Sequence, residues 1–281
     1  MKAKRLYKNL DIDFELDLCR DNWSQMDFNE FISENFKRRY MGLLLDNSKE
    51  INIAYTAVFP SDNVLNKILE IGQQNVLLIT HHPMVWDIRI TPVFQDINPK
   101  LLPRLKEQKI SIYTIHVPLD KNSDYSTTTN LARTLGVNPE GEFYEYFGVK
   151  VGIYGKVDIK TPEQLTNRLI SKIKHKAKLW KYGSDEIKNQ KVALVAGGGN
   201  EIDIIQEVID LGINTYVTGI TALNEYSQKV HDFERQNRIN IIGGTHYSTE
   251  KFACIELCKY FEKLDLNCEF IEDSPVLEDL E

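Results

Sequence analysis

The chain contains 281 residues, of which 42% are hydrophobic and 27% are charged, and its formal net charge at pH 7 is −7. This composition is typical of globular proteins and argues against a disordered or fibrous chain. The negative charge argues against tight non-specific binding to nucleic acid, because that binding depends on cationic groups that neutralise phosphates. A small-molecule substrate remains compatible with the charge, and the length is sufficient for two domains.

The sequence shows no sign of a membrane or of an oxidising compartment. No apolar run approaches the roughly 18 residues needed to span a bilayer, and the N-terminal segment lacks an apolar stretch of signal-peptide length. The four cysteines, Cys19, Cys254, Cys258 and Cys268, include no CxxC pair. We expect buried thiols rather than metal ligands or a disulfide, and cytoplasmic residence.

Periodic apolar residues predict alternating helices and strands in the first half of the chain. The N-terminal 40 residues favour helix, with an apolar stripe that includes Phe28, Phe31 and Phe36. A helix through 130–132 is expected to end at Gly136, because glycine readily adopts the left-handed backbone of a helix C-cap. The other elements predicted here are strands at 51–58, 75–80 and 111–116, a helix that begins at 60–62 and a short helix near 98–108.

The second half shows the same alternation after a crossing segment at 141–147, which we expect to separate two domains, 1–140 and 141–281. A helix should start at Thr161, where a threonine N-cap precedes proline at the first helical position. The lysine-rich stretch 171–190 is expected to be a solvated helix end and loop. The remaining predicted elements are strands at 149–155, 191–196, 213–218 and 239–243 and helices at 200–211, 221–235 and 248–264. This alternation favours an α/β fold with helix-covered sheets.

Three of the predicted strands end in side chains that commonly bind metal ions. Ligands of an open α/β sheet bind beyond the carboxyl ends of its strands, so we expect these ends to converge on one site. Imidazole and carboxylate groups together suit zinc, iron, manganese, cobalt or nickel, and do not select one of them. The side chains are His81 and His82 after strand 75–80, His116 and Asp120 after strand 111–116, and His246 and Glu250 after strand 239–243.

The His81-His82-Pro83 triplet is the strongest element of this pattern. Adjacent side chains of a regular strand point to opposite faces, but Pro83 imposes an extended or turn backbone on His82. The two imidazoles could then splay around a shared cavity and hold one ion each. Taken alone, the pair is equally compatible with two exposed histidines in a loop.

Carboxylates complete the predicted ligand set. Asp120 could bridge two cations through its two oxygens, as a site with two metals about 3.5–4 Å apart requires, and a turn or capping aspartate is the alternative. His246 and Glu250 lie four residues apart on one helix face, with an acid placed for the helix dipole as the alternative to a ligand. Because four of the six histidines occur at these strand ends, we favour the metal centre.

A run of glycines, Gly197–Gly199, lies between a predicted strand and a predicted helix. Backbone amides in such a turn can bind a phosphate, but the run lacks the ending of a P-loop and the spacing of a dinucleotide fingerprint. We favour a tight turn with Asn200 as the helix cap. Trp180 and Tyr182 are expected to be packing residues, and the sequence predicts no role for His231.

The order of these motifs resembles one protein family. The His-His-Pro triplet, the H-x-x-x-D block, the triple-glycine turn, the Thr218-Gly219 pair and the HYSTE block at 246–250 occur in the order seen in the Ngg-one-interacting-factor-three family. Its members are often called GTP cyclohydrolase I type 2 homologues. An early Met-Gly-Leu segment at 41–43 is also similar, and the resemblance extends over residues 27 to 270.

The resemblance implies two α/β lobes with mixed, helix-covered sheets and a dinuclear metal site in the cleft between them. The C-terminal part, about 239–281, would return to this cleft. Family members tend to assemble as ring-shaped hexamers, so a homohexamer is implied as well. The ligand roles carried over from the family are one ion each on His81 and His82, a bridge by Asp120, completion of the site by His246 and Glu250, and support from His116.

Two departures from the family pattern leave the metal ligands intact, and the second concerns positions of the second lobe that would face the substrate. Family members usually carry an acidic residue within the segment 57–59, where this chain reads Ala-Val-Phe. After Thr218-Gly219 they usually have an acidic residue and a histidine, whereas this chain reads Ile-Thr-Ala-Leu at 220–223 and its next histidine is His231. The resemblance therefore supports the metal ligands more strongly than the substrate.

The resulting hypothesis is a hydrolase with two divalent metal ions per chain. A water between the ions would lose a proton near neutral pH, and the hydroxide would attack an electrophilic carbon or phosphorus. If the cyclohydrolase name applies, the substrate is GTP or another nucleotide. Tyr247 and Thr249 are candidates to contact substrate or to orient a ligand histidine. The alternatives are a metal-binding scaffold or interaction protein without turnover, and a phosphoesterase or amide hydrolase that uses the same ions.

Overall fold

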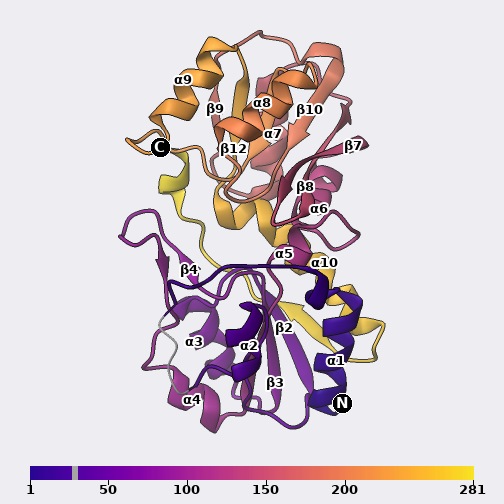
Figure 1. Ribbon diagram of the computed structural model, residues 1–281, viewed down its shortest axis with the longest axis vertical. Coiled ribbons are helices and arrows are strands. Elements are labelled where there is room, and N and C mark those ends of the chain that lie inside the picture. The colour runs from indigo at the N-terminus through magenta and orange to yellow at the C-terminus, as the bar shows by residue number, and fades with distance from the viewer. Residues whose placement is uncertain (27–30) are drawn as a thin grey trace. The chain divides into compact units, whose positions relative to one another are not determined.

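The computed structural model describes residues 1–26 and 31–281 and contains two compact α/β units (Figure 1). Unit 1 comprises Met1–Lys121, Phe147–Val149 and Cys254–Ser274, and unit 2 comprises Asn122–Tyr146, Lys150–Ala253 and Pro275–Glu281. The predicted junction at 141–147 differs from this division. The reason is that the segment before it already forms a helix and a strand of unit 2.

Unit 1 contains a five-stranded mixed sheet in the order β1-β6-β3-β2-β13. Strands β6, β3, β2 and β13 are parallel to one another, and β1 runs antiparallel beside β6. Thr80 of β3 is in register with Thr114 of β6 and with Ala57 of β2, so the carboxyl ends of these strands reach the same edge of the sheet. The strands are β1 (Gly42–Leu45), β2 (Ile53–Ala57), β3 (Val76–Thr80), β6 (Ile110–Thr114) and β13 (Cys268–Phe270), with a separate pair β4 (Val85–Trp86) and β5 (Phe94–Gln95).

Helices cover both faces of this sheet, which explains why its strands are almost wholly apolar. On one face, α2, α3 and α4 form a core with strand residues such as Tyr55 and Ile112. On the other face, Tyr7 of α1 stacks on Tyr113 of β6, with 6.0 Å between ring centroids. The helices are α1 (Ala3–Asp13), α2 (Glu34–Arg39), α3 (Asp62–Ile71), α4 (Leu102–Glu107) and α5 (Val117–Asp120), with a short 3-10 helix at Leu16–Leu18.

Local sequence accounts for where several helices begin and end. The Ser61 hydroxyl accepts a hydrogen bond from the Val64 amide at the start of α3, and Gly72 ends this helix in the left-handed conformation. Gly136 ends α6 (Thr127–Leu135) in the same way, as predicted. The predicted N-terminal helical region contains α1 and α2, whereas Phe28 lies outside the described residues.

Unit 2 contains a six-stranded mixed sheet in the order β7-β8-β10-β11-β12-β9. Its central strands β10, β11 and β12 are parallel, and β8 and β9 run antiparallel on their two sides. Thr218 of β11 is in register with Gly243 of β12, so these two strands end together. The strands are β7 (Val137–Tyr146), β8 (Val149–Val157), β9 (Lys178–Trp180), β10 (Lys191–Leu194), β11 (Thr215–Thr218) and β12 (Asn240–Gly243).

The core of unit 2 forms where α6 and α7 pack on the sheet, with buried residues such as Leu135, Leu169 and Leu194. Helix α7 begins as predicted, because the Thr161 hydroxyl accepts a hydrogen bond from the Gln164 amide. The other helices are α8 (Ile202–Asp210), α9 (Gln228–Gln236) and α10 (His246–Glu262), after α7 (Pro162–Ile173), with 3-10 helices at Lys188–Gln190 and Leu277–Leu280.

Some elements differ from those predicted. The stretch 171–190, expected to be a helix end and loop, contains the edge strand β9, which pairs with β12. The crossing segment 141–147 is largely part of β7. The helix predicted at 221–235 starts only at Gln228. The Thr221 amide donates to the Asp279 carbonyl, which holds the segment before this helix as a loop. The sequence pattern predicts neither β1 nor β13, since short edge strands show no alternation.

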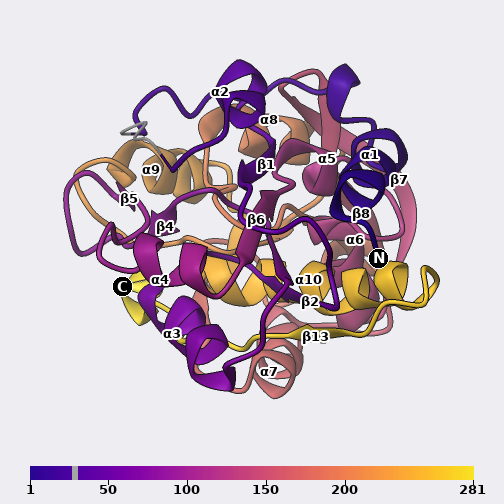
Figure 2. The same cartoon turned by 90° about the horizontal axis from the view of Figure 1, so that it is seen from below.

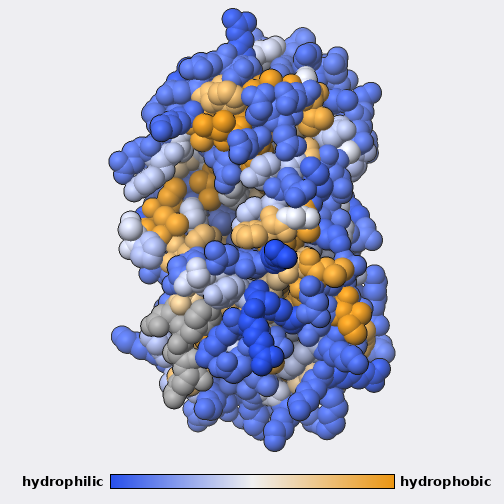
Figure 3. Space-filling model, in the orientation of Figure 1, coloured by the Kyte–Doolittle hydropathy of each residue, from blue (hydrophilic) through white to orange (hydrophobic). Residues whose placement is uncertain are grey.

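Among residues 1–26 and 31–281, none of the helices has the length and apolar character required to cross a membrane. The face drawn in Figure 3 is mainly hydrophilic, with apolar patches scattered over it. Isolated apolar patches of this kind are ordinary on protein surfaces.

Candidate metal centre

Three buried histidines of unit 1 lie together beyond the carboxyl ends of β3 and β6. His81 and His82 follow β3 directly, and His116 comes two residues after β6. One ring nitrogen of each lies within 4.8 Å of those of the other two, close enough for a single metal ion to contact all three. The pairing of Thr80 with Thr114 explains this proximity, because it brings the two strand ends side by side.

His81 is oriented by its neighbours in a way that suits a cation. Its Nδ1 lies 3.1 Å from the carbonyl oxygen of Ile115, so this nitrogen donates the proton. The remaining Nε2 then carries the lone pair, yet it faces the Asp120 carboxylate at 3.3 Å. Two acceptors at this distance repel each other unless a proton or metal ion lies between them. A backbone carbonyl that fixes the histidine tautomer is common in metal sites.

Asp21 holds His116 through Nδ1, the ring nitrogen that does not face Asp120. Asp21 Oδ2 accepts hydrogen bonds from His116 Nδ1 at 2.9 Å and from Trp23 Nε1 at 2.8 Å. Burial acts to lower the pKa of His116, but the charge and hydrogen bond of Asp21, together with the charge of Asp120, outweigh it and leave this pKa above its usual value. The other nitrogen, Nε2, lies 3.7 Å from Asp120 and so faces the same carboxylate as His81.

Asp21 is a site residue that the sequence pattern does not reveal. Its contact with His116 joins positions 95 residues apart. The segment around Asp21 follows no apolar strand, and no spacing links it to the histidine motifs. The one local signal is Trp23, a buried aromatic residue whose indole nitrogen needs an acceptor.

Aromatic rings surround His82 and shield it from water. Phe59 stacks on the imidazole with ring centroids 4.7 Å apart, and Trp23 approaches edge-on at 5.9 Å. His82 is only 2% exposed. Apolar walls lower the local dielectric constant, which strengthens the attraction between a cation and its carboxylate ligands.

In unit 2, His246 and Glu250 form a pair near the start of α10. His246 Nε2 lies 3.1 Å from Glu250 Oε1, as expected for residues four apart on a helix. Two caps hold the helix start: the Thr245 hydroxyl accepts from the Ser248 amide, and Asp279 Oδ2 accepts from the His246 amide at 2.8 Å. The predicted helix starts at residue 248, whereas α10 begins two residues earlier, at His246. The two caps explain this earlier start.

The triple-glycine turn makes room for this pair. A Cβ atom on Gly197 would lie 2.1 Å from Glu250 Oε1, and the φ of +73° also favours glycine. The Gly197 amide donates to Thr249 Oγ1 at 2.9 Å, and the Gly199 amide donates to Thr218 Oγ1 at 3.1 Å. These amides are used within the fold, which agrees with a tight turn rather than a phosphate site.

Other expectations for this region have mixed outcomes. Asn200 as a helix cap is wrong, because α8 begins at Ile202 and Glu201 occupies the N-cap position. Tyr247 is buried, and the Thr249 hydroxyl donates a hydrogen bond to the Thr245 carbonyl at the start of α10. Contact of either side chain with a substrate stays a prediction.

His231 belongs to a separate buried cluster of unit 2. Its Nδ1 lies 3.1 Å from Glu234 Oε2 on the same helix and 3.0 Å from the Tyr182 hydroxyl. The Trp180 ring meets the imidazole edge-on at 5.0 Å. Burial raises the pKa of Glu234, although the hydrogen bond and charge of His231 oppose it. Trp180 and Tyr182 are therefore packing residues, as predicted.

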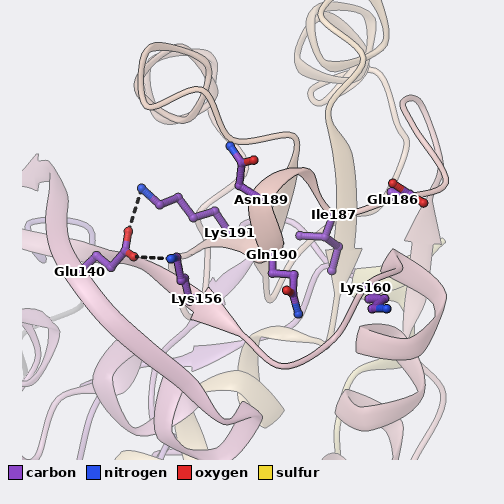
Figure 4. Close-up of a pocket in the computed structure, with 8 residues that line it drawn as sticks. All are labelled: Glu140, Lys156, Lys160, Glu186, Ile187, Asn189, Gln190 and Lys191. Atoms are coloured by element: carbon purple, nitrogen blue, oxygen red, sulfur yellow. Dashed lines mark ion pairs between the residues drawn. The ribbon is translucent and has the colours of Figure 1, made fainter.

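A hollow on unit 2 offers a different kind of surface (Figure 4). Its eight lining residues include lysines and carboxylates but no histidine. Glu140 forms ion pairs with Lys191 at 2.7 Å and with Lys156 at 3.9 Å, so opposite charges largely offset each other. The hollow therefore resembles neither a metal site nor a strong anion site.

The fold and these side chains define an α/β protein of two units, each with imidazole and carboxylate groups beyond the ends of parallel strands. The chain belongs to the Duf34/NIF3 (NGG1p interacting factor 3) family, whose model matches residues 32–275. The resemblance seen in the sequence and the predicted fold class are thereby confirmed.

Two relatives carry the same name, "GTP cyclohydrolase 1 type 2 homolog". The one from Archaeoglobus fulgidus is 26% identical over 235 residues, which cover 82% of this chain and 88% of that protein. The one from Borreliella burgdorferi is 28% identical over 254 residues, which cover 88% of this chain and 93% of that protein. A solved structure described as "Structural genomics, protein ybgI, unknown function" shares the fold, with a TM-score of 0.75, 20% identity and coverage of 98% and 100% of the two chains.

Proposed function

We propose that this chain is a hydrolase that uses two divalent metal ions. The observation that carries the proposal is the buried histidine group of unit 1, in which His81 Nε2 faces the Asp120 carboxylate. A ring-shaped homohexamer, as the family resemblance implies, and residence in the cytoplasm belong to the same proposal. The ligands in this proposal are His81, His82, Asp120, His246 and Glu250, with His116 in support.

The chemistry of the donors supports metal ions. Burial of imidazole and carboxylate groups costs free energy unless hydrogen bonds or a cation compensate for the lost water. The Nδ1 atoms bond to Ile115 for His81 and to Asp21 for His116, and the Nε2 atoms of both rings face the Asp120 carboxylate. Such a mixed set suits zinc, iron, manganese, cobalt or nickel.

The family resemblance supports ions shared by the two donor sets. It implies that His81, His82 and Asp120 of unit 1 and His246 and Glu250 of unit 2 bind the same two ions. Within each unit these side chains lie close together, as His81 and Asp120 do in unit 1 and as His246 and Glu250 do in unit 2. We therefore propose that His246 and Glu250 complete the site that the strand ends of unit 1 begin.

The side chains of this chain would position and protect the reacting groups. When bound, divalent ions would lower the pKa of a water molecule and so provide a nucleophile near neutral pH. Asp120 presents one oxygen toward His81 and the other toward His116, so both of its oxygens face the histidine group and would be placed to hold a metal ion. The rings of Phe59 and Trp23 exclude bulk water from His82.

A nucleotide is the substrate class that we propose to test first. The basis is the name that the relatives carry, which includes GTP cyclohydrolase. A metal-binding scaffold without turnover is the second candidate, and burial favours it. His81 and His82 are 1% and 2% exposed, and structural metal sites are typically closed by protein ligands.

Elemental analysis of the purified chain and a variant tests the metal site. We expect about two ions per chain in the parent protein, as a two-metal hydrolase requires, and a clear loss in His82→Ala. His175→Ala is the matched control. His175 is half-buried and hydrogen-bonded to the Ser248 hydroxyl, and it is not among the proposed ligands. Equal metal content in the parent and His82→Ala would refute the assignment.

Carboxylate variants then test whether the ions are shared. If they are shared, Asp120→Asn and Glu250→Gln weaken binding of the same ions. The double variant should then lose less metal affinity than the sum of the losses in the two single variants. Additive losses would instead mean separate sites in the two units. Glu256→Gln, on the same helix and paired with Lys259, is the control. Turnover of GTP, other nucleotides, phosphodiesters or peptides by the metal-loaded parent separates the hydrolase from the scaffold.

A further inference from the structure

Two cysteines of unit 1 form a hydrogen-bonded pair that the metal site does not use. Cys258 lies on α10, and Cys268 is the first residue of β13. A side-chain hydrogen bond joins Cys258 and Cys268, and the Cys258 thiol lies 3.8 Å from the Cys254 carbonyl oxygen, to which it donates. All four cysteines of the chain are thiols in this structure, so the pair is present in its reduced form.

Strand register explains why the two sulfurs meet. Strand β13 lies beside β2 (Figure 2) and runs parallel to it. In this pairing Cys268 is in register with Ala54. The Thr56 hydroxyl lies 3.3 Å from the Cys258 sulfur, which places Cys258 over β2 as well. Ala54 and Thr56 are two residues apart on one strand, so their side chains share a face. Both cysteines therefore lie on the face of the sheet that α10 covers.

We propose that Cys258 and Cys268 are a redox-active dithiol that closes to a disulfide when it reacts with a hydroperoxide. The Cys258 sulfur attacks the peroxide, the O–O bond breaks, and Cys258 becomes a sulfenic acid as water or an alcohol leaves. The Cys268 sulfur then attacks Cys258, the S–S bond forms, and the sulfenic hydroxyl leaves as water with the Cys268 proton. The two thiols lose two electrons, which the peroxide gains.

The surroundings assign different roles to the two thiols. The hydrogen bond with Cys268 lowers the pKa of Cys258 and outweighs burial, and Thr56 adds to this effect. The same hydrogen bond and burial raise the pKa of Cys268. The thiolate is the reactive form, so Cys258 is the first nucleophile and Cys268 the resolving thiol. Cys268 is partly exposed on an edge strand, which gives a small peroxide access to the pair.

The chain between the two cysteines already holds them close. The turn at 263–267 is fixed by hydrogen bonds from the Leu264 and Leu266 amides to the Phe261 carbonyl. Asp265 adopts a left-handed φ of 56° in this turn. A disulfide here would join the end of α10 to the edge strand β13, and so restrain the edge of the sheet.

Thiol counting and peptide mapping of the full chain test the proposal. The reduced protein is treated briefly with hydrogen peroxide, quenched and denatured. We expect two of the four thiols to disappear, with a mass decrease of about 2 Da for the two hydrogens lost, and to return with dithiothreitol. The peptide map should contain Cys258 linked to Cys268.

Serine variants separate this pair from the other cysteines. Cys258→Ser and Cys268→Ser should each abolish the loss of two thiols, whereas Cys254→Ser and Cys19→Ser should retain it. Cys254 is a matched control, because it lies one turn earlier on α10 and its thiol donates to Ala57. If a variant fails to fold, the map of the parent protein still decides. Retention of all four thiols, or a link between Cys258 and a different cysteine, would overturn the proposal.

Discussion

The two units hold their metal-type side chains by different means. In unit 1, Asp21, His81 and Asp120 come from separate segments and are brought together by strand register and side-chain contacts. In unit 2, His246 and Glu250 come from one helix at a spacing of four residues, and a glycine turn leaves room for them.

This difference shows where each set is vulnerable. A helical pair keeps its spacing through backbone geometry, so loss of the space around it should be the most damaging change. A set built at strand ends loses its geometry when a partner that orients one ring is removed.

Gly197→Ala should have the largest effect, in unit 2. The new Cβ would lie 2.1 Å from Glu250 Oε1 at a φ of +73°. The left-handed backbone costs roughly 1–2 kcal/mol for a non-glycine residue, and overpacking adds about 1–3 kcal/mol. We expect the free energy of unfolding, measured in urea, to fall by about 3 kcal/mol.

Gly212→Ala is the matched control for that variant. Gly212 has a φ of +69°, but a Cβ there would meet nothing within 4 Å. It should lose only the backbone contribution of roughly 1–2 kcal/mol. Equal losses in the two variants would show that Gly197 is needed for its backbone conformation and not for the room it gives Glu250.

Asp21→Asn should have the next largest effect, in unit 1. The change removes the charge that orients His116 through Nδ1 and leaves buried donors less well satisfied. We expect the free energy of unfolding to fall by about 1–2 kcal/mol in urea. Asp17→Asn is the control, since Asp17 is 87% exposed and pairs with Arg39 at the surface. Similar changes in the two variants would mean that His116 is held without help from Asp21.

Glu234→Gln should have the smallest effect and sharpens the comparison, because Glu234 pairs with His231 on one helix outside the proposed ligands. Burial raises the pKa of Glu234 in the folded state, so the folded chain binds this proton more tightly than the unfolded one. Its contribution to stability is therefore present at low pH and is lost as the pH rises from the ordinary value of 4.5 through the raised pKa.

In Glu234→Gln, the thermal midpoint of unfolding should fall less steeply as the pH rises from acid to neutral than in the parent protein. The metal content should not change. Asp232→Asn, a half-exposed carboxylate on the same helix, is the control. A decline as steep as in the parent protein would assign the pH dependence to other groups.

The sequence by itself determined the local elements and the chemistry they carry. The caps at Ser61 and Thr161, the glycine after α6, and the histidines after β3 are all visible in short stretches. These signals act over a few residues, which is why they can be recognised without a structure. The motif order predicted the family, which the family match confirms, and the alternation of strands and helices predicted the α/β class, which the shared fold of a solved structure confirms.

Only the tertiary structure decided which distant residues meet. Asp21 contacts His116 because of how the N-terminal segment packs, Cys268 reaches Cys258 because β13 joins the edge of a sheet, and Gly197 makes room for Glu250. Strand pairing and helix packing bring these residues together. Neither is encoded by local propensity, so no pattern along the chain could have shown these contacts.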